Sequence, residues 1–156
     1  MAIELTNIDE LDAKIIGLLA ADGRMAFSEI GRQVNLSRSA VRDRVMALQE
    51  KGVIEKFTCI INPRKVGYGL SVFFEIECIP NKLIDAANKL VEYGEIQSCN
   101  QMSGKSLLHA HGAFRDTSHL ENFLFKVVYS LPGVSSVQTS ILLRGIKTKM
   151  GGFKIN

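Results

Sequence analysis

The spacing of the hydrophobic residues changes near Gly52, and this change constrains the fold more than any other feature of the chain. Before Gly52, apolar residues recur every three or four positions, which is typical of amphipathic helices. After Gly52, short apolar runs alternate with two helical stretches and with turns rich in Gly, Pro and Asn. We therefore expect an α+β protein with a helical N-terminal part and a mixed C-terminal part.

The first 52 residues predict three helices separated by short turns. Asn7 and Glu10 have the spacing of a capping pair for the first helix, and Gly23 would end it. Ser28 is expected to cap a short second helix, and Ser37 a third one that ends at Gly52. The apolar stripe of the first helix is Ile8, Leu11, Ile15, Leu18 and Leu19.

The turn before the third helix has the residues that a helix-turn-helix requires. Gly31 is small enough to let two helices approach closely. Asn35 tolerates a positive φ better than most residues other than glycine, and Leu36 can fill the corner with an apolar side chain. Ser37 can cap the next helix, and the free amides of such a helix start can bind a phosphate.

The third helix combines an apolar face with arginines. At 100° per residue Val41, Val45 and Leu48 share one face, which would pack inward. A helix of this kind fits the major groove of DNA, which is about 12 Å wide. An ordinary helical hairpin with solvated arginines is the alternative, in which Arg44 would be a structural ion-pair partner. The predicted DNA-binding residues are Ser37, Arg38, Ser39, Arg42 and Arg44.

The second half of the chain has the element order β-α-β-β-α-β, which is the ferredoxin-like arrangement. Segment 53–61 resembles a strand, and 62–69, with Pro63, Gly67 and Gly69, is predicted to be a turn and hinge. We expect a DNA-binding domain over 1–52, a linker over 53–69 and a βαββαβ domain over 70–156. Within that domain, strands are expected over 70–79, 95–102, 106–114 and 134–143, and helices over 82–93 and 117–131.

Composition and charge exclude several classes of protein. The net charge of +3 is too small to indicate a polyanionic partner by itself. Binding to DNA must therefore be inferred from local clusters of basic residues. The sequence contains no run of 18 apolar residues that could span a membrane. Its first ten residues do not resemble a signal peptide. Cys59, Cys78 and Cys99 are odd in number and lie in apolar runs, which suits buried free thiols in a reducing compartment. We expect a cytoplasmic protein without a membrane partner.

Four fragments of the chain resemble one family. In order, "LDAKIIGLLAADGR", "LSRSAVRDRVMALQEKGVIEKF", "NPRKVGYGL" and "LPGVSSVQTSILL" are similar to the Lrp/AsnC (feast/famine) transcriptional regulators. The resemblance implies an N-terminal winged helix-turn-helix, a linker strand pair around "EKFTCIINP" and a C-terminal effector-binding domain. It also implies homodimers that often assemble to octamers, with amino acids bound between dimers in many members. The implied function is sequence-specific binding of double-stranded DNA to regulate transcription, with neither enzymatic activity nor a cofactor or metal.

The loop 103–108, "SGKSLL", departs from this family. Members usually have a glycine followed by an acidic and aromatic run that lines the effector pocket; here Gly104 is kept but Lys105 reverses the charge. Asp116 and Thr139 match family positions near the pocket. The resemblance therefore implies an effector site at Gly104, Lys105, Ser106, Asp116 and Thr139. The pocket could be empty, altered towards an anionic ligand, or unused.

Four other interpretations have weaker support. "SGKS" lacks the first glycine of a phosphate-binding loop, because position 99 is Cys, and a strand rather than a helix follows. His109 and His111 would share one face of a strand, but a surface or interface role is favoured over metal binding. Sirohaem decarboxylases resemble the family in both domains, yet this chain has few histidines and lacks their motif. A scaffold with a vestigial DNA-binding head is the fourth alternative.

Overall fold

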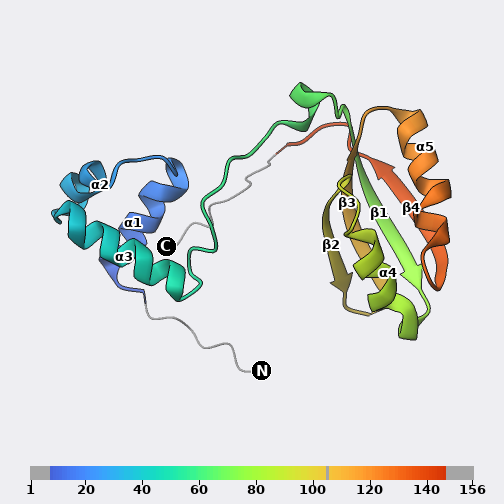
Figure 1. Ribbon diagram of the computed structural model, residues 1–156, viewed down its shortest axis with the longest axis horizontal. Coiled ribbons are helices and arrows are strands. Elements are labelled where there is room, and N and C mark those ends of the chain that lie inside the picture. Colours follow the sequence, from blue (N-terminus) through green and yellow to red (C-terminus); the bar gives the residue numbers. More distant parts are fainter. Residues whose placement is uncertain (1–7, 105, 147–156) are drawn as a thin grey trace. The chain divides into compact units, whose positions relative to one another are not determined.

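The computed structural model describes residues 8–104 and 106–146, which form two compact units (Figure 1). The helix-turn-helix unit covers residues 8–60, and the sheet unit covers residues 61–146. The boundary between the two units lies between residues 60 and 61, inside the predicted linker 53–69. The predicted domain limits 1–52, 53–69 and 70–156 stay predictions. None of the described helices is both long and apolar enough to cross a bilayer.

Three helices build the helix-turn-helix unit: α1 (Glu10–Ala21), α2 (Phe27–Val34) and α3 (Arg38–Glu50). They follow the periodicity predicted from the sequence, because each turns its apolar stripe to a common interior. Ser37 caps α3 as expected. The buried residues of this interior are Ile15, Leu19, Ile30, Val34, Val41 and Val45.

The starts of the first two helices differ from the prediction. Asp9 caps α1, with its Oδ1 accepting a 2.7 Å hydrogen bond from the Asp12 amide; Asn7 lies outside the described residues. Helix α2 begins at Phe27, which packs against the interior, so Ser28 lies inside the helix and does not cap it. Capping follows the turn that tertiary packing selects, and several polar residues near a helix start can compete for it.

The prediction of a linker strand over 53–61 is wrong. These residues have no strand structure, and the side chains of Phe57, Ile60 and Ile61 are exposed by 46%, 63% and 64%. A strand needs a partner for its backbone hydrogen bonds, and no described segment supplies one. The wing implied by the family resemblance is accordingly not formed within residues 8–60. A short 3₁₀ helix, Pro63–Val66, follows, capped by Asn62.

The sheet unit has the ferredoxin-like topology that the element order predicts. Strands β1 (Leu70–Cys78), β2 (Ile96–Met102), β3 (Leu107–Phe114) and β4 (Val134–Ile141) form one sheet in the order β2-β3-β1-β4. All neighbouring pairs are antiparallel, and Phe74 of β1 lies opposite Ala110 and Thr139. Helices α4 (Leu83–Leu90) and α5 (Thr117–Lys126) are flanked by 3₁₀ turns at Pro80–Lys82 and Val128–Ser130, so both are shorter than predicted.

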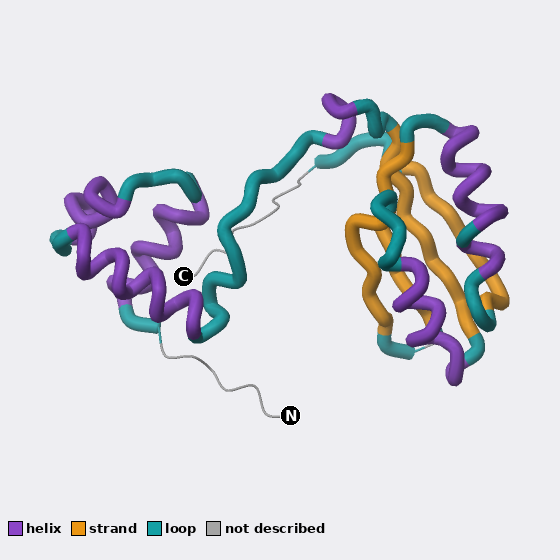
Figure 2. Tube along the Cα trace, in the orientation of Figure 1, coloured by secondary structure: helices purple, strands orange, loops and turns teal. Residues whose placement is uncertain are grey.

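Both helices cover one face of this sheet (Figure 2). The covered face carries Val72, Phe74 and Ile76 of β1, which are at most 1% exposed and pack against Leu90 and Phe123. On the opposite face, which we call the open sheet face, alternate residues of the strands point away from the helices. Phe73 on this face keeps 45% of its surface exposed. The open sheet face includes Phe73, Glu75, His109 and His111.

Candidate nucleic-acid interface

The turn between α2 and α3 has the geometry of a helix-turn-helix corner. Asn35 ends α2 in the left-handed conformation, at φ 55°, as its side chain predicts. The Leu36 amide donates a 2.9 Å hydrogen bond to the Gly31 carbonyl, and the Leu36 side chain packs against the interior. A Cβ at position 31 would overlap the Leu36 carbonyl, so the close approach of the two helices requires glycine there.

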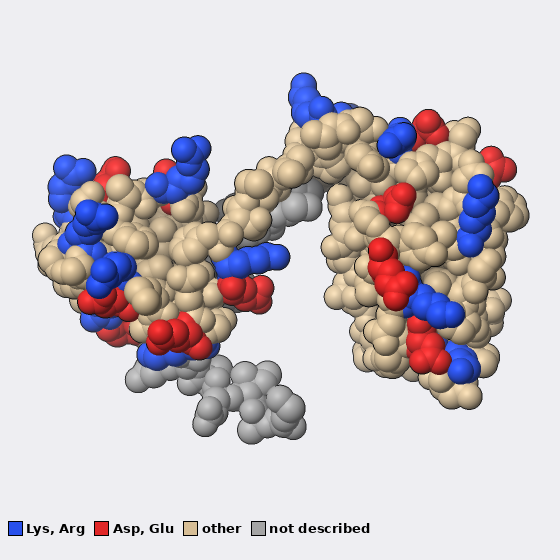
Figure 3. All heavy atoms as spheres, viewed as in Figure 1, with Lys and Arg blue, Asp and Glu red and all other residues tan. Residues whose placement is uncertain are grey.

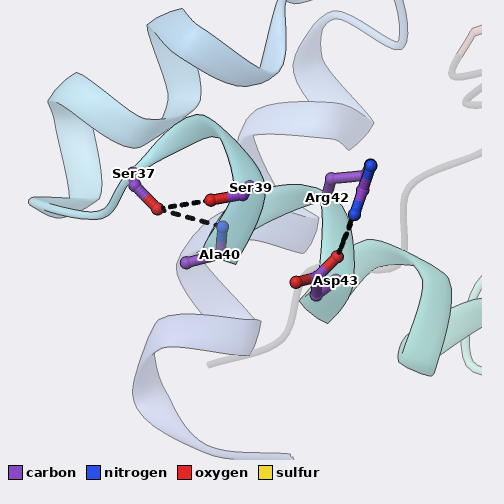
Figure 4. Close-up of polar contacts among 5 residues, drawn as sticks. All are labelled: Ser37, Ser39, Ala40, Arg42 and Asp43. Atoms are coloured by element: carbon purple, nitrogen blue, oxygen red, sulfur yellow. Dashed lines mark hydrogen bonds and ion pairs between the residues drawn. The ribbon is translucent and has the colours of Figure 1, made fainter.

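Ser37 organises the start of α3. Its Oγ accepts a 3.1 Å hydrogen bond from the Ala40 amide and lies 3.0 Å from the Ser39 Oγ (Figure 4). The amides of Arg38 and Ser39 belong to the first helical turn, where no preceding turn offers a carbonyl. A helix start with such amides carries a partial positive charge and suits a phosphate oxygen.

The outer surface of α3 presents the remaining polar candidates. Val41, Val45 and Leu48 are at most 2% exposed and hold the helix on α1 and α2. Arg38, Ser39 and Arg42 are exposed. The Arg42 guanidinium contacts Asp43, with Nη2 2.9 Å and Nε 3.1 Å from Oδ1 (Figure 4). Four of the five predicted contact residues, Ser37, Arg38, Ser39 and Arg42, thus lie in the exposed N-terminal part of α3.

Arg44 is held inside the unit. Its Nη1 lies 2.6 Å from Oδ2 of Asp9 and 2.7 Å from Oδ1 of Asp12, which ties α3 to the start of α1. The hydrogen bonds that Arg44 donates to Asp9 and, to a lesser extent, to Asp12 raise the pKa of Arg44 above its usual value. This geometry supports the structural alternative for Arg44. Sequence reasoning missed Asp9 and Asp12 as its partners, because they lie 35 and 32 positions away.

The charges of the unit are mixed on its surface. Lys and Arg side chains are spread over the helix-turn-helix unit, with Asp and Glu between them (Figure 3). Binding to a polyanion would therefore depend on which basic residues face it, rather than on a uniformly positive surface.

The predicted effector residues do not meet within one chain. Gly104, at φ 100°, and Ser106 lie in the turn between β2 and β3, whereas Asp116 follows the other end of β3 and caps α5 through a 2.8 Å hydrogen bond from the His119 amide. An eight-residue strand such as β3 spans about 25 Å. Thr139 is exposed in the middle of the edge strand β4, and Lys105 lies outside the described residues.

One polar atom in that turn is unusual. The Ser106 Oγ is buried, and no described residue is within hydrogen-bonding distance of it. Buried hydroxyls nearly always have a partner. Among the described effector candidates, Ser106 is therefore the one with a buried polar atom that has no hydrogen-bond partner.

Histidines and cysteines do not form a metal site in the described part of the chain. His109 Nε2 lies 3.1 Å from Oε1 of Glu75, and the His111 ring stacks on Phe73 with centroids 4.6 Å apart. Cys78 is buried and Cys99 half-buried. Cys59 is exposed, contrary to the prediction of a buried thiol, because the strand expected around it is not formed.

These features define a two-domain helix-turn-helix protein. It has a corner with Asn35 in the left-handed conformation, a capped and exposed helix α3, and a separate ferredoxin-like unit. Family profiles match both parts: the AsnC-type helix-turn-helix domain over residues 8–49 and the Lrp/AsnC ligand binding domain over residues 71–151. The chain belongs to the Lrp/AsnC family of transcriptional regulators.

Individual relatives agree with this family. The HTH-type transcriptional regulator LrpA of Pyrococcus horikoshii is 36% identical over 140 residues, which is 90% of this chain and 99% of the relative. A transcriptional regulator of Neisseria meningitidis, crystallised in complex with L-Met, is 26% identical with a TM-score of 0.81, covering 91% of this chain and 94% of that one. Escherichia coli AsnC has the same fold, with a TM-score of 0.87 at 23% identity over 96% of this chain and 100% of that one. The protein is a DNA-binding transcriptional regulator and not an enzyme.

Proposed function

We propose that the protein binds double-stranded DNA as a homodimer, with the N-terminal half of each α3 in the major groove. The observation that carries the proposal is the start of α3, where Ser37 holds the cap while Arg38, Ser39 and Arg42 stay exposed. Arg42 is proposed to contact base edges, and the Ser37 cap with Arg38 and Ser39 to contact bases or phosphates. Arg44 would orient α3 through Asp9 and Asp12.

The open sheet face is the proposed dimer contact. Phe73 is a large aromatic residue at the centre of this face, and its ring is partly covered by His111. An exposed apolar surface at the centre of a sheet is typical of a protein–protein contact. A dimer presents two α3 helices to a pseudo-palindromic site, and further assembly to octamers would follow the habit of the family. Because a transcriptional regulator must reach the DNA that it binds, we propose a cytoplasmic location for this protein.

For the effector, we propose an anionic amino-acid-like metabolite bound near Gly104, Lys105 and Ser106, with Asp116 and Thr139 nearby. The positive charge of Lys105 and the unpartnered Ser106 hydroxyl both suit oxygen acceptors. Because Ser106 and Asp116 lie at opposite ends of β3 in one chain, a pocket that includes both would have to form between protomers.

Fluorescence anisotropy with a DNA site selected from a random library tests the DNA contact. Arg42→Ala should weaken binding to the selected site by about 1–3 kcal/mol if Arg42 contacts a guanine. Arg24→Ala, in the turn after α1, is the matched control and should change little. A loss of equal size on random DNA would make Arg42 a phosphate contact. No loss at either DNA would contradict the proposed placement of α3.

Sedimentation tests the dimer contact. Phe73→Asp should convert dimers to monomers, because a carboxylate would be buried in the contact. Phe125→Asp is the control: Phe125 is 65% exposed on α5, on the helical side of the sheet. Monomers of the unaltered protein at micromolar concentration would contradict the proposal.

Calorimetry tests the effector class. Saturable binding of a dicarboxylate, lost in Ser106→Ala, would support an anionic ligand. Tight, saturable binding of an ordinary neutral amino acid would overturn it.

A further inference from the structure

Asp43 occupies an unexpected position for an acid in a DNA-binding helix. Counting 100° per residue, Asp43 lies almost opposite the buried face formed by Val41, Val45 and Leu48. Its side chain keeps 63% of its surface exposed. If α3 enters the groove with its outer side, as proposed above, this carboxylate is at the centre of the contact.

The carboxylate and the neighbouring guanidinium form one polar unit. Nε and Nη2 of Arg42 both donate to the same oxygen, Oδ1 of Asp43, at 3.1 and 2.9 Å. Oδ2 has no hydrogen-bond partner among the described residues. Arg42 uses only part of its donor set in this contact, since a guanidinium has five N–H groups. The outer side of α3 therefore presents donors and a free acceptor next to each other (Figure 4).

This arrangement complements one kind of base pair. In the major groove a G·C pair presents the acceptors O6 and N7 of guanine beside the N4 amino donor of cytosine. Arginine donates to guanine, and a carboxylate accepts from the cytosine amino group. An A·T pair presents a different order of donors and acceptors, and phosphates offer no donor to a carboxylate.

The pair has no evident structural role. Both side chains are at least 60% exposed, and exposed ion pairs contribute little to folding stability. Arg38, one turn earlier, has no carboxylate partner among the described residues and remains available to a phosphate. Arg42 thus has a carboxylate beside it, whereas Arg38 has none within the described part of the chain.

We propose that Asp43 is a specificity-determining residue, which orients Arg42 towards guanine and accepts a hydrogen bond from the amino group of a cytosine in the same or the adjacent base pair. At a site where no amino donor lies opposite it, the carboxylate loses water without gaining a hydrogen bond, and it faces the phosphates as a like charge. Asp43 therefore weakens binding to random DNA more than binding to the preferred site. This proposal rests on the proposed placement of α3 in the major groove.

Selection from a random DNA library with the full-length protein, followed by affinity measurement at one fixed salt concentration, tests this role. The unaltered protein should select a G·C pair at a defined position of each half-site, and replacement of that pair should cost about 5- to 150-fold in affinity. Asp43→Ala, which removes both the charge and the acceptor oxygens, should remove the requirement at that position alone and tighten binding to random DNA about two- to tenfold. Glu50→Gln, which removes one negative charge near the C-terminal end of the same helix, should keep the requirement.

A double-mutant cycle separates orientation from simple charge repulsion. Arg42→Ala and Asp43→Ala should be coupled on the selected site and additive on random DNA. If Asp43→Ala tightens binding equally on both DNAs and selects the same sequence, Asp43 is only a repulsive charge and the proposal is overturned. If the unaltered protein selects no sequence, the proposed placement of α3 fails as well, and the two failures are thereby distinguished.

Discussion

Arg44 of α3 and Asp12 of α1 lie 32 positions apart in the chain and form an ion pair, with Arg44 Nη1 2.7 Å from Asp12 Oδ1. This ion pair joins the two helices. The Asp12 side chain is only 12% exposed, and the Arg44 side chain 32%. The pair therefore lies where the recognition helix meets the helix that supports it. A residue that seemed from the sequence to belong to the DNA contact thus fixes the orientation of the contact helix.

Removing Arg44 should destabilise the helix-turn-helix unit. Arg44→Ala leaves the buried Asp12 carboxylate without its partner, and we expect the free energy of unfolding to fall by about 1–3 kcal/mol. Chemical denaturation at pH 7 measures the loss. Arg42→Ala is the control, because its ion pair is exposed on both sides and its loss should change stability by less than about 0.5 kcal/mol. Equal effects of the two variants would contradict the structural role of Arg44.

Acid should weaken the same region. The Asp12 amide, and then the Arg44 side chain, hydrogen-bond to Asp9 and hold the pKa of that carboxyl below its usual value. As the pH falls, the Asp9 carboxyl is therefore protonated at a higher pH in the unfolded chain than in the folded protein. The stabilisation by Asp9 is complete above about pH 4 and is lost as the pH falls through the folded pKa. Asp9→Asn keeps an oxygen for the cap but does not titrate, so urea unfolding between about pH 5 and 2 should depend less on pH in this variant.

Gly31 should not tolerate a side chain. In Gly31→Ala the new Cβ would overlap the Leu36 carbonyl, and we expect a loss of about 1–3 kcal/mol in the free energy of unfolding. Gly17→Ala on α1 is a matched control: nothing lies within 4 Å of its Cβ, and helix propensity should stabilise the protein by about 0.5–1 kcal/mol. Thermal unfolding of both variants checks the difference in sign. A stabilised Gly31→Ala protein would show that the corner can open.

His111 should make the sheet unit less stable in mild acid. Burial lowers the pKa of its imidazole, and the buried Nε2 has no partner among the described residues. The unfolded chain binds the proton more readily, so the free energy of unfolding should fall as the pH drops below about 6.5. His111→Gln should remove this pH dependence, whereas His109→Gln, which changes the residue beside Glu75, should keep it. Identical pH profiles for the unaltered protein and His111→Gln would rule out this role.

Much of the fold follows from local patterns. The helical periodicity around Val41 and Val45, the cap at Ser37 and the positive φ of Asn35 each depend on a few neighbouring residues, and the structure agrees with all three. The order of strands and helices after residue 69 also predicts the sheet topology, because few connections of these elements are compatible with an antiparallel sheet. The candidate contact residues at the start of α3 were predictable for the same reason.

The errors have a common cause. Segment 53–61 has the composition of a strand but no partner to pair with in the described chain, and Cys59 is exposed with it. The effector candidates stay a prediction: Ser106 and Asp116 are ten positions apart in sequence, and within one chain β3 separates them. Composition describes what a segment can form, whereas pairing and separation depend on the rest of the molecule.

The sequence by itself therefore determined the two-part architecture, the position of the recognition helix and the corner that precedes it, since periodicity, capping and backbone preference act within one or two helical turns. Only the tertiary structure decided which arginine stays on the exposed surface and which is held between two helices. Arg44 contacts Asp9 and Asp12, while Arg42 lies beside Asp43 on the outer surface. These arginines are two positions apart on one helix and differ by about 200° in direction, so the packing of α1 against one side of α3 gives them different partners.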